Sequence, residues 1–198
     1  GLRVTSIAVA GIGEIQGGIK GTSGGMATLQ DNVWHFQMLI NSDIQSGNIN
    51  SLVSGNDQIA WLASNDKGII RYKYDEWESM STGLPILSQN FSTLTKSPDG
   101  SIWAGSEASQ LIHFYDSNFS ILNTGTSKPI TTLAASMDNT IWIGTSGAGI
   151  ISFDGKNWKS YTAENEAMPS DSIMYLTTAG PGNLLFSVSG GKLYLLKP

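Results

Sequence analysis

The chain has 198 residues, of which 40% are hydrophobic and only 14% are charged. That balance predicts a folded protein with a sizeable core and excludes disorder, which needs low hydrophobicity and high net charge. The net charge is −5 and there are no basic clusters, so the chain lacks the positive surface that binds nucleic acids or anionic lipids, and we expect neither as a partner. The absence of cysteine excludes disulfides, thiolate metal sites and cysteine nucleophiles. No apolar run approaches the roughly 18 residues of a membrane span, so we expect no membrane insertion.

A motif of about forty residues recurs five times along the chain. The copies cover residues 4–41, 49–81, 91–122, 130–162 and 173–198. The first is the loosest, because its opening hairpin is about three residues longer than the others. The remaining four carry a leucine at a fixed place, and these leucines lie 42, 39 and 43 residues apart: Leu52, Leu94, Leu133 and Leu176. Internal repetition at this period is typical of repeat architectures.

Each copy predicts four short strands separated by Gly, Asp and Asn turns. The fourth copy is the clearest, with segments 130–133, 141–145, 150–153 and 158–161. A tryptophan nine residues after the leucine marks the second strand in three copies, and Leu185 takes its place in the last. Strands such as 141–143 are apolar on consecutive residues, which indicates sheets buried on both faces.

One forty-residue sheet cannot cover two apolar faces alone, so the copies must stack. We therefore predict an all-β fold, a β-propeller of five blades with four antiparallel strands each, forming one domain over residues 1–198. The chain ends at Pro198 before a fourth strand, so we expect a three-stranded last blade in a closed, monomeric ring. Two alternatives stay open: the N-terminal residues pair onto that blade, or another chain completes its edge.

The fourth copy resembles the two-component-regulator propeller repeat, in the run from Asp138 through Ile141-Trp142-Ile143-Gly144 to Asp154-Gly155. Pro98-Asp99-Gly100-Ser101-Ile102-Trp103 matches the same pattern. The resemblance is strong over 49–161 and weaker elsewhere. It implies a propeller of the kind found in extracytoplasmic sensor regions of hybrid histidine kinases, often in gut bacteria that sense glycan fragments. We accordingly expect an extracytoplasmic protein, periplasmic or on the cell surface, whose signal peptide has been removed.

Aromatic and histidine side chains are explained by packing rather than chemistry. Tryptophans fill one slot on the second strand (Trp61, Trp103, Trp142) and one on the fourth (Trp34, Trp77, Trp158). Side chains repeated at one place in every blade are expected to fill gaps between blades. His113 lies on a third strand and His35 on a fourth strand. Each stands at a position of the repeat that is polar in nearly every copy, so we predict that both histidines lie at the surface. No metal site and no cofactor is expected.

Most acidic residues fall in or beside hairpin turns, where turn chemistry explains them: Asp31, Asp57, Asp75, Asp99, Asp116, Asp138 and Asp154. Asp66 and Glu107 differ, because they occupy turns between second and third strands where other copies have Gly, Ser or Ala. The glycine-rich runs 21–25 and 144–149 lack the Lys-Ser/Thr ending of a phosphate loop, so we predict hairpin turns there.

The connections between copies are polar and unequal, as is typical of loops that carry recognition: 41–48, 81–90, 123–129 and 162–172. Their ends should lie beside the turns between second and third strands. We therefore predict a ligand site made of these residues: Asn48, Asp66, Lys67, Asn90, Glu107, Gln110 and Ser172.

Two functions fit this pattern. The first is a non-enzymatic binding or sensing module whose ligand is a carbohydrate or a partner protein. The second is a glycan-cleaving enzyme that uses Asp66 and Glu107, which requires their carboxyl groups to lie roughly 5 to 9.5 Å apart.

Overall fold

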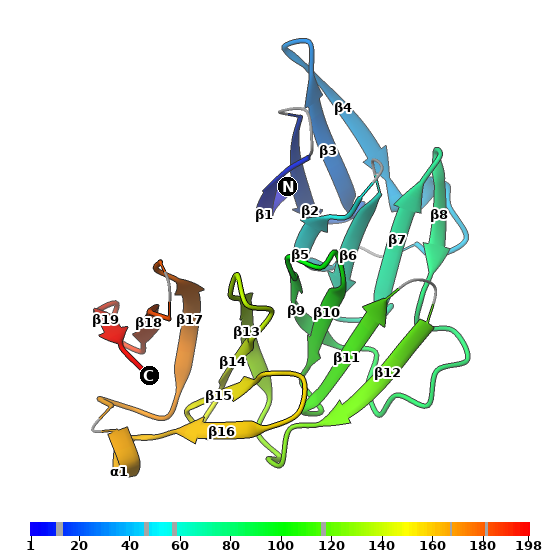
Figure 1. Ribbon diagram of the computed structural model, residues 1–198. Coiled ribbons are helices and arrows are strands. Elements are labelled where there is room, and N and C mark those ends of the chain that lie inside the picture. The colour runs from blue at the N-terminus through cyan, green and yellow to red at the C-terminus, as the bar shows by residue number, and fades with distance from the viewer. Residues whose placement is uncertain (11–13, 46–47, 57–58, 116–117, 167, 181) are drawn as a thin grey trace. The chain divides into compact units, whose positions relative to one another are not determined.

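The computed structural model describes residues 1–10, 14–45, 48–56, 59–115, 118–166, 168–180 and 182–198. Over these residues the chain forms five antiparallel sheets, in each of which the strands follow one another in chain order (Figure 1). Four sheets have four strands and the last has three, which confirms the predicted blades and the short final one. The chain divides into two compact units, Gly1–Leu94 and Thr95–Pro198.

The first unit contains the first two sheets. The first sheet is formed by β1 (Arg3–Val9), β2 (Ile15–Lys20), β3 (Gly25–Gln30) and β4 (Val33–Met38). The second is formed by β5 (Ile49–Ser54), β6 (Ala60–Ser64), β7 (Ile69–Lys73) and β8 (Glu76–Ser79). A 3-10 turn, η1 (Leu39–Asn41), begins the connection between them. Arg3 pairs with Lys20, so the N-terminal strand belongs to the first sheet.

The third sheet begins with a strand that spans the boundary between the units. It is formed by β9 (Phe91–Lys96), β10 (Ile102–Ser106), β11 (Gln110–Tyr115) and β12 (Asn118–Asn123). The fourth is formed by β13 (Ile130–Ala135), β14 (Ile141–Thr145), β15 (Ile150–Phe153) and β16 (Trp158–Tyr161). The fifth is formed by β17 (Ile173–Thr178), β18 (Leu184–Val188) and β19 (Leu193–Leu196). A four-residue helix, α1 (Ala163–Glu166), lies in the connection before it.

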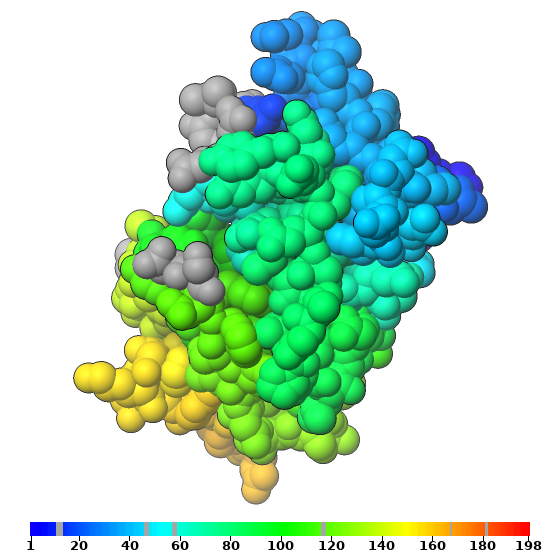
Figure 2. Space-filling view, turned by 90° about the vertical axis from the view of Figure 1, so that its right-hand side faces the viewer, coloured from blue at the N-terminus to red at the C-terminus, as the bar shows by residue number. Residues whose placement is uncertain are grey.

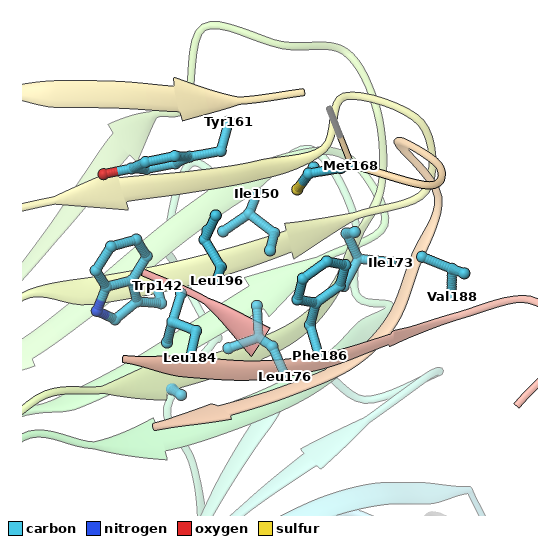
Figure 3. Packing of buried hydrophobic residues seen from close by; sticks show 11 residues of the cluster. Trp142, Ile150, Tyr161, Met168, Ile173, Leu176, Leu184, Phe186, Val188 and Leu196 are labelled. Atoms are coloured by element: carbon cyan, nitrogen blue, oxygen red, sulfur yellow. The ribbon is translucent and has the colours of Figure 1, made fainter. Parts of the chain in front are cut away.

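The cores lie between consecutive sheets. Between the fourth and fifth sheets, Trp142, Ile150 and Tyr161 pack against Leu176 and Phe186 (Figure 3). In the first unit, a similar cluster joins the first sheet to the second. Each large side chain removed from water in this way contributes about 1.5–3 kcal/mol. The second strands β6, β10 and β14 are buried along their whole length, as expected for sheets covered on both faces.

Hydrogen bonds join the first strands of consecutive sheets. In the first unit, Asn50 Nδ2 donates to the carbonyl of Phe91 (2.9 Å), and Ser51 Oγ accepts from the amide of Leu94 (3.2 Å). These bonds draw β5 and β9 together and satisfy backbone groups at strand edges.

The same arrangement recurs in the second unit. Thr131 Oγ1 donates to the carbonyl of Ile173 (2.7 Å), and Thr132 Oγ1 accepts from the amide of Leu176 (3.4 Å). The residues stand at the places in the repeat that Asn50 and Ser51 occupy. A polar pair at the start of the first strand is therefore a recurrent device for joining one sheet to the next.

The tryptophans divide into two groups. Those on second strands are buried as predicted, at 8% or less exposed: Trp61, Trp103 and Trp142. Those on fourth strands are more open, and Trp34 is 48% exposed. In the four-stranded sheets the fourth strand is an edge strand, so its side chains have a neighbouring strand on one side only. The prediction of gap-filling tryptophans is therefore correct for the second strand and only partly correct for the fourth.

Hydrogen bonds to turn amides confirm the turn role predicted for Asp99, Asp138 and Asp154. Asp99 Oδ1 accepts from the amide of Ser101 (2.9 Å), and Asp138 Oδ1 accepts from the amide of Thr140 (3.1 Å). Hydrogen bonds from the backbone and side-chain amides of Asn157 and from the backbone amide of Lys156 lower the pKa of Asp154 to about 2. Asp57 and Asp116 lie outside the described residues. Both glycine-rich runs connect second to third strands, as predicted.

Among the described residues, no helix has the length and apolar character that a membrane crossing requires. In the same part of the chain, no group of three or more His, Cys, Asp or Glu side chains gathers in a way that could hold a metal ion.

Candidate ligand-binding site

In the second, third and fourth sheets, a hydroxyl at the end of the second strand shapes the turn that follows. Ser64 Oγ accepts hydrogen bonds from the amides of Asp66 and Lys67 (both 3.3 Å) and donates to Asp66 Oδ1. Ser106 and Thr145 accept from turn amides at the same place in their own sheets. The hydroxyl of Ser64 thus holds the backbone of the turn in place, and the side chains of Asp66 and Lys67 are exposed there.

The connections return along these turns, as the sequence predicts. In the second unit, the amide of Gly149 donates to the carbonyl of Asp171 (2.9 Å). In the first unit, the amide of Gly68 donates to the carbonyl of Gln89 (2.9 Å). The connection Ser81–Asn90 follows β8 in the chain and is largely exposed, within the green part of the surface in Figure 2. A connection end and a turn therefore form one continuous polar surface.

In the first unit, Asn65 begins the turn after β6 and Asn90 ends the connection whose residue Gln89 is hydrogen-bonded to Gly68 of that turn. Ser146 and Ser172, which hold the same places in the fourth and fifth repeats, form a β-bridge. The bond between Gly68 and the residue before Asn90 gives the first unit the same geometry. Asn90 was predicted from the sequence, whereas Asn65 was not.

Asn48 joins the cluster from the other connection. Its Nδ2 donates to Asp66 Oδ2 (3.5 Å), and its carbonyl accepts from the amide of Asn65 (3.1 Å). It also forms a β-bridge with Lys20, whose Nζ donates to Asn50 Oδ1 (3.4 Å). Four predicted residues, Asn48, Asp66, Lys67 and Asn90, thus lie in one polar cluster of the first unit.

Two acceptors of this cluster are unused by the protein. The side-chain oxygens Asn65 Oδ1 and Asn90 Oδ1 are both buried, and neither accepts a hydrogen bond. Leaving a buried polar atom unpaired costs about 1–3 kcal/mol, so such atoms call for a partner. Next to them stand a carboxylate and an ammonium group, Asp66 and Lys67, both exposed. At the surface the cluster offers the carboxylate acceptor of Asp66 and the ammonium donor of Lys67 to a hydroxyl-rich ligand, and the two unpaired amide oxygens lie buried beside them.

Glu107 and Gln110 lie at the corresponding turn of the third sheet, in the second unit. The amide of Gln110 donates to Ser106 Oγ (3.1 Å), and Glu107 is exposed. Ser109 Oγ donates to the carbonyl of Lys128 (2.9 Å), so this turn adjoins the next connection. Ser172 lies with Ser146 at the turn of the fourth sheet instead.

The seven predicted residues therefore do not form one described cluster. Asp66 belongs to the first unit and Glu107 to the second, so the enzyme hypothesis built on their carboxyl groups stays a prediction.

His113 is half-buried and so only partly the surface residue that the sequence predicts. Its ring stacks on Trp103, with ring centroids 4.0 Å apart, and its Nε2 is buried without a hydrogen bond. Burial lowers the pKa of His113, and the nearby carboxylate of Asp99 offsets part of that effect. In the second sheet, Arg71 at the same slot likewise lies over the second-strand tryptophan, with its guanidinium carbon 5.7 Å from the centroid of the Trp61 ring.

Comparison with known proteins gives structural matches alone. Neither family models nor curated proteins match the sequence. Two extracellular domains, each named as part of a hybrid two-component system of B. thetaiotaomicron, are similar with TM-scores of 0.76 and 0.73 at 17% and 16% identity. They match over 97% of this chain, and the chain spans 27% and 28% of their lengths.

A catalytically inactive virginiamycin B lyase of Staphylococcus aureus, with quinupristin, is also similar. Its TM-score is 0.76 at 14% identity, over 100% of this chain and 70% of the lyase. Likeness at such identities establishes the architecture. The fold is a β-propeller. The propeller predicted from the repeats is confirmed, and activity, substrates and partners are not carried over with it.

Proposed function

We propose that this chain is a non-enzymatic, extracytoplasmic binding or sensing module that recognises a carbohydrate. The binding residues are the polar cluster of the first unit: Asn48, Asn65, Asp66, Lys67 and Asn90. The observation that carries the proposal is the pair of buried, unpaired oxygens Asn65 Oδ1 and Asn90 Oδ1.

The chemistry of the cluster suits a sugar. A hydroxyl group can donate to an amide oxygen while it accepts from an amide or ammonium donor. Asn65 and Asn90 supply acceptors, Lys67 supplies a donor, and Asp66 supplies a charged acceptor that Ser64 and Asn48 already orient. These groups stand on turns and connections held by a rigid sheet, the usual position of recognition residues.

The comparisons support the sensing part of the proposal. Sensor-type extracellular domains of hybrid two-component systems share the architecture. The repeat itself resembles the two-component-regulator propeller repeat, and we assign the chain to that family on this combined ground. An extracytoplasmic location follows from the same assignment.

A thermal-shift screen against host and plant oligosaccharides tests the proposal. A ligand at about 100 times its Kd adds roughly 2.7 kcal/mol to the free energy of unfolding. We expect one class of sugar to raise Tm by several degrees, and Asn65→Ala and Asn90→Ala each to reduce or abolish that shift. Asn41→Ala is the matched control, because it removes an exposed amide at the start of the connection to β5.

The other outcomes are distinct. A shift that survives both substitutions would place the sugar elsewhere. Release of product during incubation would favour the glycan-cleaving enzyme, and its loss in Asp66→Asn and Glu107→Gln would assign the two carboxylates. No shift with any sugar would contradict the carbohydrate proposal and favour a protein ligand.

A further inference from the structure

The face of the first sheet that points away from the second is apolar and open. Ile7 and Phe36 on this face are 70% and 59% exposed. They surround Gly17 and Ala27, and with Trp34 they line a groove of about 370 Å³. A contiguous apolar surface of this kind is unusual on a monomer and marks an interaction site.

The equivalent face is covered in the other sheets. Ile7 stands at the leucine position of the repeat, where Leu52, Leu133 and Leu176 are at most 7% exposed. In the fourth sheet, Leu133 is covered by Trp103 on the second strand of the sheet before it. This face of a sheet is therefore built to receive the second-strand face of another sheet.

The composition of the groove fits such a partner. Gly17 and Ala27 replace the larger Ile143 and Ile151 of the fourth sheet, which leaves room for bulky side chains. Phe36 takes a place at which the second and fourth sheets carry serine, so the rim is more apolar than a solvent-facing edge requires.

The last sheet presents the complementary face. Leu193 and Leu195 on β19 are 69% and 52% exposed. Leu195 occupies the third-strand slot that is polar in the four other sheets: Thr28, Arg71, His113 and Ser152. The polar pair that joins one sheet to the next is replaced by Met174 and Tyr175, both exposed. This face of the last sheet therefore presents the aliphatic side chains of Leu193 and Leu195, the latter at a position where the other sheets present hydrogen-bonding groups.

We propose that the groove of the first sheet binds the last sheet of a second copy of this chain, head to tail. Leu193 and Leu195 of one copy fill the space over Gly17 and Ala27 of the next, in the order in which consecutive sheets pack within each unit. The two faces differ, so the contact is heterologous and builds a ring or a longer array. The closed monomeric ring that the sequence predicts would instead pack the last sheet against the first sheet of the same chain.

Molar mass in solution tests the proposal. Sedimentation and light scattering of the purified chain should give multiples of 21.1 kDa that grow with concentration. Phe36→Lys and Leu195→Lys should each reduce the mass to 21.1 kDa, because each places an unpaired charge in the contact. Met137→Lys, at a residue 88% exposed in the first hairpin of the fourth sheet, should leave the assembly intact.

Mixing the two disrupted variants tests the direction of the contact. Phe36→Lys keeps its last sheet and Leu195→Lys keeps its first sheet, so an equimolar mixture should form a dimer and no larger species. A symmetric contact between two first sheets would leave Leu195→Lys assembled, and this result would overturn the proposal. A wild-type chain that stays monomeric up to about 100 μM, where even a weak complex would form, would overturn it as well.

Discussion

Gly149 ends the turn between β14 and β15 with φ +72°, a torsion that favours glycine. A Cβ at this position would overlap the backbone oxygen of Tyr161 on the next strand. Gly68 stands at the same place in the second sheet with φ +73°, and a Cβ there would meet the hydroxyl of Ser81. The glycine lets the connection approach the turn, and this approach creates the polar cluster.

Gly149→Ala should lower the free energy of unfolding by about 2–4 kcal/mol, since it adds a clash with backbone to the torsional strain. Urea denaturation measures the change. Gly155→Ala is the control, because Gly155 also has positive φ but no atom lies within 4 Å of its Cβ position. It should cost about 1 kcal/mol from torsion alone. Equal losses would show that the close approach to Tyr161 has no energetic weight.

The environment of His113 shifts its protonation equilibrium, so this residue makes the stability of the fold depend on pH. Burial against Trp103 lowers its pKa below the unfolded value of 6.5, so the neutral ring is favoured in the folded state. The unfolded chain then binds more protons just below that value, and stability falls as the pH falls. The contribution is fully present above pH 6.5 and is lost as the pH drops through the lower pKa of the folded state.

We expect His113→Gln to flatten the change in the free energy of unfolding between about pH 7.5 and about pH 5.5. Denaturation with urea at both pH values measures it. His35→Gln removes the exposed histidine on β4 and controls for the loss of an imidazole as such. A His113→Gln chain that loses as much stability on acidification as the wild type would contradict the assignment.

At the scale of elements, the hydrogen bonds between first strands specify how each sheet joins the next. Thr131→Val keeps the shape of the side chain but removes the donor to the carbonyl of Ile173. We expect a loss of about 1 kcal/mol in the free energy of unfolding. Thr131→Ser restores the hydroxyl and should recover most of the loss. If Thr131→Ser and Thr131→Val lower the free energy of unfolding equally, packing rather than the hydrogen bond joins β13 to β17.

The strands could be predicted from the sequence wherever burial imposes a pattern. The second strands β6, β10 and β14 are apolar on consecutive residues and are buried throughout. The fourth strands are ambiguous in the sequence, because Trp34 and Trp158 repeat at one position yet lie at a sheet edge. Repetition reveals equivalent positions in each sheet but does not distinguish a position covered on both sides from one at the edge.

The candidate site shows the same limit. Asn48, Asp66, Lys67 and Asn90 could be predicted, because turns and connection ends meet wherever the repeat is regular. Asn65 could have been found as the residue four positions after the second-strand tryptophan, where Ser146 stands in the fourth repeat. The sequence predicts that His113 faces solvent, whereas its ring is half-buried against Trp103 on the neighbouring strand. A polar position that an aromatic ring covers has the same sequence pattern as an exposed polar position.

At the scale of the whole molecule, the protein is a scaffold of repeated sheets that carries unequal connections. Repeated sheets supply a rigid frame, and the connections, which are free to differ, supply recognition. The net charge of −5 argues against binding through long-range attraction to polyanions. Specificity must therefore come from short-range groups such as the amides of Asn65 and Asn90.

The most direct test of the binding proposal is a crystal structure of the chain soaked with the oligosaccharide that raises Tm most. The account predicts sugar hydroxyls at hydrogen-bond distance, roughly 2.5–3.0 Å, from Asn65 Oδ1 and Asn90 Oδ1. Sugar density on another surface of the chain, or no density at saturating concentration, would contradict it.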